Sequence, residues 1–330
     1  MKNSALLVFA AAALAVGTGA LAQSAVTVYG RVDLSVTRQN DGTSPINGGN
    51  GQLGAAAKRW DVRNGSAGRL GFRGVEDLGG GLSASFLLEH RFTADNGQAL
   101  TPFFQRGAYV ELGQKGVGSV YLGREYFPVF WPALRLDPWG FDSAGSPGTK
   151  HQLANYIVDG GIRTNNSVGV RSASWAGITV NLATAAGERA RPRSDGANIE
   201  YRQGPWYAGA GWDRTDSRNK VALAGASYDF RIIRPMFLYT ESTVAGVEQK
   251  NMTLAATIPL PQAIGKFAVA RLDPAGANNN NTRIGLGYEY LLSKRTSLMA
   301  NLGSSKQQGR AAGRDLTRST VYETGIKHSF

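Results

Sequence analysis

Hydrophobic and polar residues alternate along most of this chain. In its first such segment, Val28, Val32 and Val36 fall on one face, and Arg31 and Asp33 fall on the other. A period of two residues predicts a β-strand whose two faces meet different surroundings. The same alternation predicts sixteen strands, at residues 26–38, 67–78, 82–92, 104–113, 119–126, 163–173, 177–186, 197–203, 206–214, 220–230, 233–243, 247–258, 264–272, 282–292, 296–306 and 320–330.

The connections between these segments alternate in length. Short ones such as Gly79-Gly80-Gly81 and Gly204-Pro205 are built from turn residues, whereas polar stretches such as 39–66, 127–162 and 307–319 are long. Short turns on one rim and long loops on the other are typical of an up-and-down transmembrane β-barrel. In lipid every backbone group needs a partner, so the antiparallel sheet must close on itself.

Alternation alone does not separate such a barrel from a soluble β-sandwich or propeller, where the apolar face points inward. The last segment favours the barrel, because Tyr322, Ile326 and Phe330 share one face and the sequence ends on that aromatic residue. Chain ends of soluble domains tend to be polar and frayed. We expect residues 320–330 to pair with 26–38 and close the sheet, with Phe330 at the periplasmic rim.

The first 22 residues are typical of a secretory signal peptide. Lys2 supplies the positive start, residues 5–16 form a short apolar run, and Ala20-Leu21-Ala22 is a small-residue cleavage site. A retained membrane helix is the weaker alternative. The sequence therefore predicts export, with residues 23–330 as a single barrel domain.

The amino-acid composition limits which forces can stabilise the fold and which molecules the protein can attract. Cys is absent, so an exported chain of this kind needs either a large soluble core or barrel closure. The formal net charge of +12 predicts attraction to anions, including the phosphates of lipopolysaccharide, and export argues against nucleic acid.

Residues that would carry enzymatic chemistry are scarce. The three histidines have no metal-ligand spacing, no Gly-x-Ser-x-Gly elbow occurs, and the glycine pairs do not sit at a strand-to-helix junction. We therefore expect no catalytic site, metal or cofactor. Two alternatives stay open: a secreted or periplasmic all-β binding protein, and a barrel enzyme with a site on its rim.

Four stretches carry a family resemblance that runs the length of the chain. They are residues 26–33 (VTVYGRVD), 68–82 (GRLGFRGVEDLGGGL), 120–124 (VYLGR) and 325–330 (GIKHSF). The chain resembles the general porins of beta-proteobacterial outer membranes, of the neisserial and Burkholderia type. The resemblance implies a sixteen-stranded homotrimer in outer-membrane lipid, a third long loop folded into the pore, and passage of small hydrophilic solutes. It also implies that the outer-membrane assembly machinery reads Phe330, in the strand that carries Tyr322.

The resemblance also implies basic residues at the starts of the second, fourth and sixth strands, facing the constriction. These are Arg69, Arg106 and Arg163. In the alternation of their strands, Arg69 and Arg163 fall on the face that points into the lumen. Arg106 does not, so either a bulge near Gly107 redirects it or it lies above the lipid band.

Further lumen candidates follow from strand parity and from the third long loop, 127–162. The basic ones are Arg31, Arg73, Arg91 and Arg124, of which Arg124 has the same parity problem as Arg106. Acidic Glu125 and Asp137 would face a basic wall and set a field across the pore, whereas Asp142 fits loop solubility. Fixed arginines lower the entry barrier for anions, so anion selectivity is expected. This loop is richer in aromatic residues and proline than is typical of the family.

Overall fold

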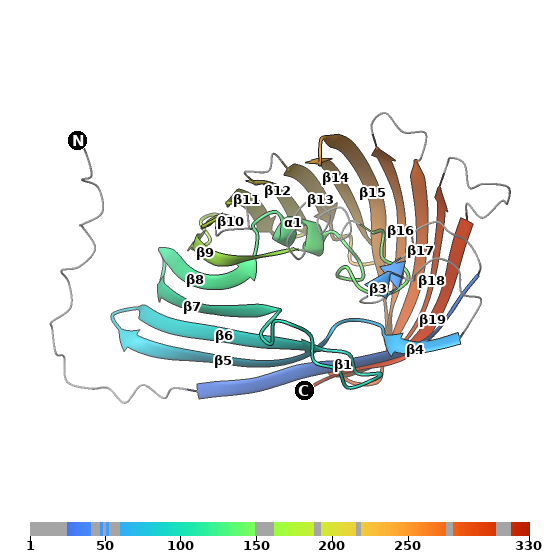
Figure 1. The fold of residues 1–330 in the computed structure, drawn as a ribbon, viewed down its shortest axis with the longest axis horizontal. Helices are drawn as coiled ribbons and strands as arrows, with labels where there is room; N and C mark the ends of the chain where they lie inside the picture. The colour runs from blue at the N-terminus through green and yellow to red at the C-terminus, as the bar shows by residue number, and fades with distance from the viewer. Residues whose placement is uncertain are drawn as a thin grey trace.

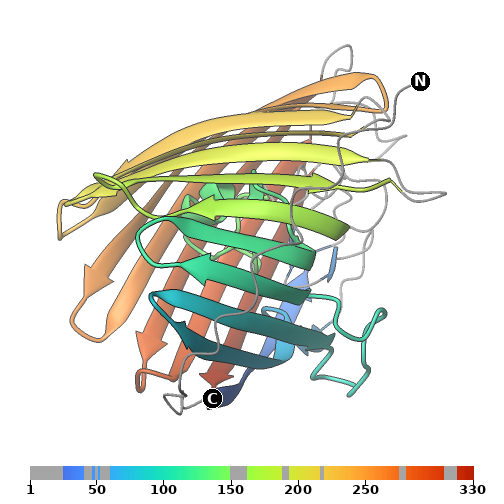
Figure 2. The same cartoon turned by 90° about the vertical axis from the view of Figure 1, so that its left-hand side faces the viewer.

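The computed structural model describes residues 25–40, 47–48, 51–52, 60–148, 162–187, 193–215, 219–274, 280–307 and 318–330. The predicted signal peptide, residues 1–22, lies outside the described residues. The described chain is a ring of antiparallel strands around an open interior (Figure 1). Figure 2 shows the strands side by side at a common tilt across the barrel wall.

The strands and the helix succeed one another in a simple order. A small separate hairpin is formed by β2 (Asn47–Gly48) and β3 (Gly51–Gln52). The wall is formed by β1 (Ala25–Gln39), β4 (Trp60–Asn64), β5 (Gly68–Gly79), β6 (Leu82–Phe92), β7 (Gly107–Gln114), β8 (Gly118–Tyr126), β9 (Arg163–Ser172), β10 (Ile178–Ala185), β11 (Ser194–Gln203), β12 (Trp206–Thr215), β13 (Lys220–Tyr228), β14 (Arg234–Val244), β15 (Val247–Leu260), β16 (Ala263–Pro274), β17 (Asn281–Leu291), β18 (Thr296–Gln307) and β19 (Arg318–Ser329). The helix α1 (Phe130–Arg135) lies between β8 and β9.

The sheet closes between its first and last strands, as the sequence predicted. β1 pairs with β19 antiparallel, from Arg31 opposite Ser329 to Gln39 opposite Val321. The backbones of Gly30 and Phe330 exchange two hydrogen bonds, of 3.0 and 3.1 Å. Closure leaves no free edge in the barrel wall.

All sixteen predicted segments are strands of this wall, with ends that differ by a few residues. The sheet has 17 strands because the second strand position is divided into β4 and β5, which both pair with β1. The barrel therefore has sixteen strand positions. The prediction of a polar connection over 39–66 is wrong at its end, because β4 continues the second strand past an irregular stretch at 65–67.

The two faces of the strands differ in exposure as the alternation predicts. On the outer face, Val28 is 54% and Ile326 49% exposed, whereas Asp33 and Glu323 on the inner face are only 2% and 3% exposed. Apolar side chains therefore point out of the barrel and polar ones point in, the arrangement that suits a lipid exterior. This excludes a soluble sandwich, in which the apolar faces would be buried.

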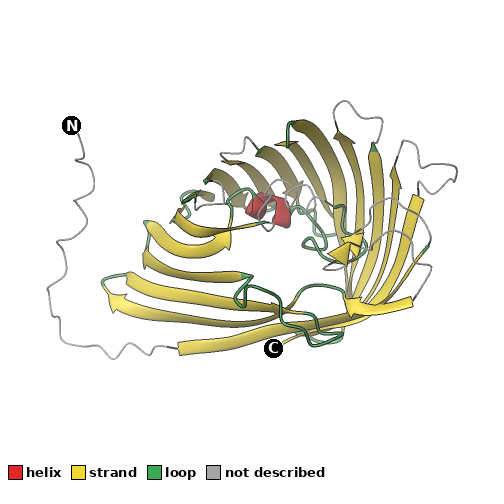
Figure 3. Cartoon of the chain, viewed as in Figure 1, coloured by secondary structure: helices red, strands yellow, loops and turns green. Residues whose placement is uncertain are grey.

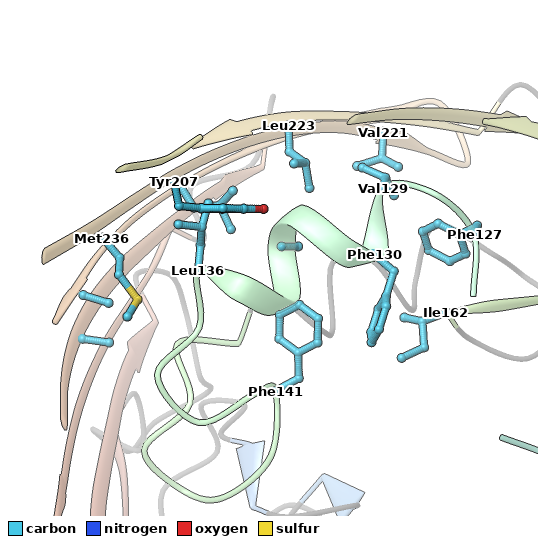
Figure 4. Packing of buried hydrophobic residues seen from close by; sticks show 14 residues of the cluster. Phe127, Val129, Phe130, Leu136, Phe141, Ile162, Tyr207, Val221, Leu223 and Met236 are labelled. Atoms are coloured by element: carbon cyan, nitrogen blue, oxygen red, sulfur yellow. The ribbon is translucent and has the colours of Figure 1, made fainter. Parts of the chain in front are cut away.

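One part of the inner wall departs from this rule. Val221 and Leu223 of β13 and Met236 and Leu238 of β14 point inward and are at most 5% exposed. They are covered by the loop after β8, whose helix α1 packs against β11, β12 and β13. Figure 3 shows this helix inside the ring of strands, and Figure 4 shows the cluster between helix and wall. The expectation of a third long loop folded into the barrel is confirmed for residues 127–148.

Among the described residues, no helix has the length and hydropathy of a membrane-spanning helix.

Candidate pore constriction

A row of arginines crosses three neighbouring strands. Arg31 of β1 is the direct register partner of Arg69 of β5, which is in turn the partner of Arg91 of β6. Like charges directly opposite one another on a sheet are destabilising. Arg69 donates only to the carbonyl of Ala67, at 3.5 Å, among the described residues. The row therefore presents concentrated positive charge to the barrel interior.

A second basic group surrounds Tyr126. Arg106 forms an ion pair with Glu89 and donates to the Tyr126 hydroxyl at 3.3 Å. Arg163 also donates to this hydroxyl, and its guanidinium lies over the Tyr126 ring, 3.8 Å from the centroid. Glu89 in turn accepts a hydrogen bond of 2.8 Å from Tyr29. These contacts fix both guanidinium groups before any solute arrives.

Two further arginines extend the basic wall along β8 and β9. Arg124 donates to the carbonyl of Gln105 at 2.8 Å. Arg171 forms ion pairs with Glu111 at 2.5 Å and with Glu125 at 2.8 Å. These pairs neutralise part of the wall and hold it rigid. The row Arg31, Arg69 and Arg91 adds further positive charge to the same cavity.

The opposite face of the interior belongs to the loop and is largely apolar. Trp131, Leu134, Trp139 and Phe141 all border the main cavity, which has a volume of about 900 Å³. Eight arginines and four carboxylates line this cavity, a formal excess of four positive charges. The acidic members are Glu89, Glu125, Asp142 and Glu200. An apolar side thus faces a cationic side across one water-accessible space.

The wall itself holds the loop at several points. The carboxylate of Asp213 on β12 accepts from the Val129 backbone N–H at 2.8 Å, and Asn198 of β11 donates to the Pro128 carbonyl at 2.6 Å. Near its tip, Glu323 of β19 accepts from the Ala144 N–H at 2.8 Å and from the Ser143 hydroxyl. The loop is therefore tied to the wall at both of its described ends.

One glycine makes the close approach of the loop tip possible. A Cβ at Gly285 of β17 would clash with the backbone of Gly145 in the loop. Beside it, the Trp139 indole donates to the Asn301 side chain at 2.8 Å. The tip therefore rests directly on the strand backbone, which sets how far the loop reaches into the interior.

Most residues that the sequence singled out come together here. Those that line the cavity are Arg31, Arg69, Arg91, Arg106, Arg124, Arg163 and Glu125. Two do not line it. Arg73 is exposed, beyond the cavity, with its guanidinium 5.3 Å from the centre of the Tyr29 ring. Asp137 is 6% exposed and accepts from the Trp139 N–H and the Ser146 hydroxyl, so it braces the loop internally.

Arg106 and Arg124 face the cavity although strand alternation placed them on the opposite face. Arg106 precedes β7, which starts at Gly107 rather than at residue 104, and its backbone N–H donates to the Glu89 carbonyl at 3.0 Å. Glu89 is also the register partner of Gly107, so Arg106 and Gly107 both face Glu89. This irregular pairing is of the type expected of a bulge near Gly107, and Arg106 lines the cavity. Arg124 lies within an irregularity of the β8–β9 pairing between Gly123 and Glu125, where Gly123 adopts φ +137°. This bulge turns Arg124 inward.

Sequence reasoning missed two lining arginines, Arg135 and Arg171. Arg171 shares the inward parity of Arg163 on the same strand, so parity could have found it. Arg135 ends α1 and forms an ion pair with Glu200 across the helix–wall contact. No periodic signal identifies such a residue, because its direction depends on how the loop folds.

The two residues assigned to closure lie on the outer face of the seam. Tyr322 is 60% and Phe330 47% exposed. The Phe330 ring occupies the space that a side chain at Gly30 would fill. The described residues contain no cluster of three or more His, Cys, Asp or Glu able to hold a metal ion.

A closed sixteen-stranded barrel with an apolar outside, a charged inside and an inward loop defines an outer-membrane channel. The model of the Gram-negative porin family matches residues 10–310, and the chain belongs to this family. The protein is therefore a porin of the bacterial outer membrane, as the first motifs indicated.

Individual relatives agree with this assignment. The chain is 30% identical to Outer membrane porin protein 32 of Delftia acidovorans, over 99% of this chain and 95% of that relative. It also resembles the solved anion-selective porin from Comamonas acidovorans, with a TM-score of 0.80 and 26% identity over 93% of this chain and all of that one. The trimer form of OmpT from Vibrio cholerae, at 13% identity, covers 93% of this chain and 99% of its own, and its TM-score of 0.68 shows the fold alone.

Proposed function

We propose that this porin is a general diffusion channel that passes small anions more readily than cations. The observation that carries the proposal is the register-aligned row of Arg31, Arg69 and Arg91 beside a cavity with excess positive charge. The structurally similar Comamonas acidovorans porin is described as anion-selective, which supports the same preference here. Passive passage needs no catalytic residue, metal or cofactor.

The physical basis is electrostatic. Two unit charges about 4 Å apart interact by about 1 kcal/mol in water and by more where the effective dielectric constant falls, as in a narrow lumen. A fixed cationic row therefore lowers the entry barrier for anions and raises it for cations. The acidic partners of Arg106 and Arg171 reduce this effect locally, but the cavity as a whole is lined by eight arginines and four carboxylates.

The reversal potential of the channel in a planar bilayer under a potassium chloride gradient tests the proposal. We expect the sign that corresponds to chloride permeation. A potential of the cation sign would contradict it. Single-channel conductance with a series of polymers of increasing size would show whether the pore admits small solutes without discrimination.

We propose further that the working form is a homotrimer in outer-membrane lipid and lipopolysaccharide. Support comes from a structurally similar porin known in a trimer form. Native mass spectrometry from mild detergent should give three times the mass of the chain without its signal peptide. A monomer that conducts normally would argue against the trimer.

We propose that residues 1–22 are a signal peptide and that Phe330 is read by the barrel assembly machinery. The Phe330 ring is exposed on the outer face of the seam, where a partner can reach it. Deletion of Phe330 should lower the yield of assembled channel more than the conductance of the channels that form. A normal yield would contradict the role, and N-terminal sequencing of the assembled protein locates the cleavage site.

A further inference from the structure

The side of the cavity formed by the loop carries aromatic and apolar side chains, which anion selectivity does not explain. Opposite the arginines, the loop presents Trp131, Leu134 and Trp139, each partly exposed, at the edge of the cavity. A pore for hydrophilic ions alone would be served by polar side chains at these positions. Figure 1 shows α1 on the side of β11–β13, with β1, β5 and β6 across the interior.

The aromatic residues are held in a fixed stack. The Tyr126 and Phe130 rings are parallel within 8° with centroids 3.7 Å apart, and Arg163 covers the other face of Tyr126. Trp131 stands on edge against both rings, at 5.2 Å from Tyr126 and 5.5 Å from Phe130. Arg135 lies over the Trp131 ring at 5.7 Å from the centroid, and the fixed inner rings hold Trp131 from the other side. The part of the ring that these groups leave free is a rigid aromatic surface at the cavity, available at little cost in conformational entropy.

We propose that the constriction binds aromatic carboxylates during passage, with the ring against Trp131 and the carboxylate on the arginine row. This rests on the proposed anion preference. Guanidinium groups bind carboxylates through paired, charge-assisted hydrogen bonds. An aromatic ring adds offset-stacked or edge-to-face contact with the loop face. A small aliphatic anion makes only the first contact, and an aromatic cation only the second.

Such binding is weak enough for transport. Aromatic pairs contribute roughly 0.5–1.5 kcal/mol beyond burial, which corresponds to a roughly two- to tenfold gain in affinity. A site of this strength concentrates the solute in the constriction and still releases it, which conduction requires. The site is also well placed, because the loop residues and the arginine row line the same cavity.

The test uses the full-length assembled porin in planar bilayers and single-channel recording. Benzoate should interrupt the chloride current at concentrations about two- to tenfold lower than acetate. Cyclohexanecarboxylate, which has a similar size but no aromatic ring, should interrupt it less than benzoate. Equal potency of benzoate and acetate would overturn the proposal, and equal potency of benzoate and cyclohexanecarboxylate would overturn its aromatic part.

Two variants separate this proposal from anion preference itself. Trp131→Leu keeps apolar volume without the ring, so benzoate should lose its advantage while the potassium chloride reversal potential keeps its anion sign. Trp175→Ala is the matched control, since Trp175 is 77% exposed at a turn away from the cavity and should change neither measurement. Undiminished benzoate interruption in Trp131→Leu overturns the aromatic site, whereas a cation-sign potential in the unmodified porin contradicts the anion preference.

Discussion

The inside of this barrel has two walls of opposite character. Along β1, β5, β6, β8 and β9 the residues that border the cavity include Arg31, Arg69, Arg91, Arg124, Arg163 and Arg171. Arg171 is held by carboxylates. Along β13 and β14 the inward residues are Val221, Leu223, Met236 and Leu238, and the loop buries them. The charged side chains of the first wall border the cavity. The apolar side chains of the second wall are removed from water because the loop packs over them. Selectivity and pore size therefore depend on different strands.

The charged wall gives the largest expected effect. In the double variant Arg31→Gln and Arg69→Gln, we expect the anion-to-cation permeability ratio to fall roughly tenfold, because each fixed charge near a passing ion is worth about 1 kcal/mol or more. Reversal potentials measure the ratio. Arg73→Gln, which removes a charge beyond the cavity, is the control and should change the ratio less than about twofold, since exposed charges are screened by salt. An unchanged ratio in the double variant would rule out the row as the selectivity element.

A mutation in the apolar contact between loop and wall should change the resistance of the loop to protease. Leu136 is 1% exposed between loop and wall, and truncating a buried leucine costs about 2–5 kcal/mol. Leu136→Ala should therefore increase cleavage of the loop by added protease by about thirtyfold or more, since 1.4 kcal/mol is about a factor of ten. Leu122→Ala, at a leucine that is 52% exposed on the outer face, is the matched control. A loop as resistant as that of the control would mean that the apolar contacts do not hold it.

The tip of the loop should show a smaller effect. Glu323→Gln keeps the shape of the side chain but weakens the hydrogen bonds from Ser143 and Ala144, at a cost of about 1–3 kcal/mol. Hydrogen exchange at the Ala144 amide should speed up by about tenfold. Glu76→Gln, at an exposed site on β5, gives the background. If both variants exchange alike, Glu323 is not an anchor.

The smallest expected effect is on the pH dependence of loop docking. Burial raises the pKa of Asp137, in the loop and outside the strands, to about 6. Because the folded carboxyl holds its proton more tightly, its contribution to docking is fully present below the unfolded pKa of about 4 and is lost as pH rises through 6. Loop cleavage by added protease should thus be slower at pH 5 than at pH 7, after correction for protease activity. Asp137→Asn should abolish this difference; if the difference persists in the variant, another group causes it.

The two walls also differ in how far the sequence predicted them. Alternation located all sixteen strand positions of the wall but neither β4 nor the β2–β3 hairpin, and parity placed Arg31, Arg69 and Arg163 inside. Parity failed where the backbone is irregular, at the start of β7 for Arg106 and at Gly123 for Arg124, because one extra or missing residue reverses every face that follows. A period of two does not reveal such local breaks.

The apolar wall was not predicted at all. Val221 and Leu223 alternate with Ala222 and Ala224, so both faces of that strand are apolar and the pattern gives no direction. Their burial depends on contact with a loop more than 80 residues earlier in the chain, such as the bond between Asp213 and Val129 at a separation of 84 residues. The aromatic content of residues 127–162 was the one visible sign, and its partner surface could not be located from periodicity.

The seam between β1 and β19 has a consequence for how the barrel is made. Every other neighbouring pair in the wall joins successive strand positions along the chain, whereas the seam joins residues 31–39 to 321–329. Contacts between distant parts of a chain form late, because a large loop must be closed first. During synthesis and export β1 keeps an open edge, which can pair with another chain. The slowest step and the greatest risk of aggregation therefore fall on the same pair of strands, so a weakened seam should reduce how many channels form and leave unchanged how each one conducts.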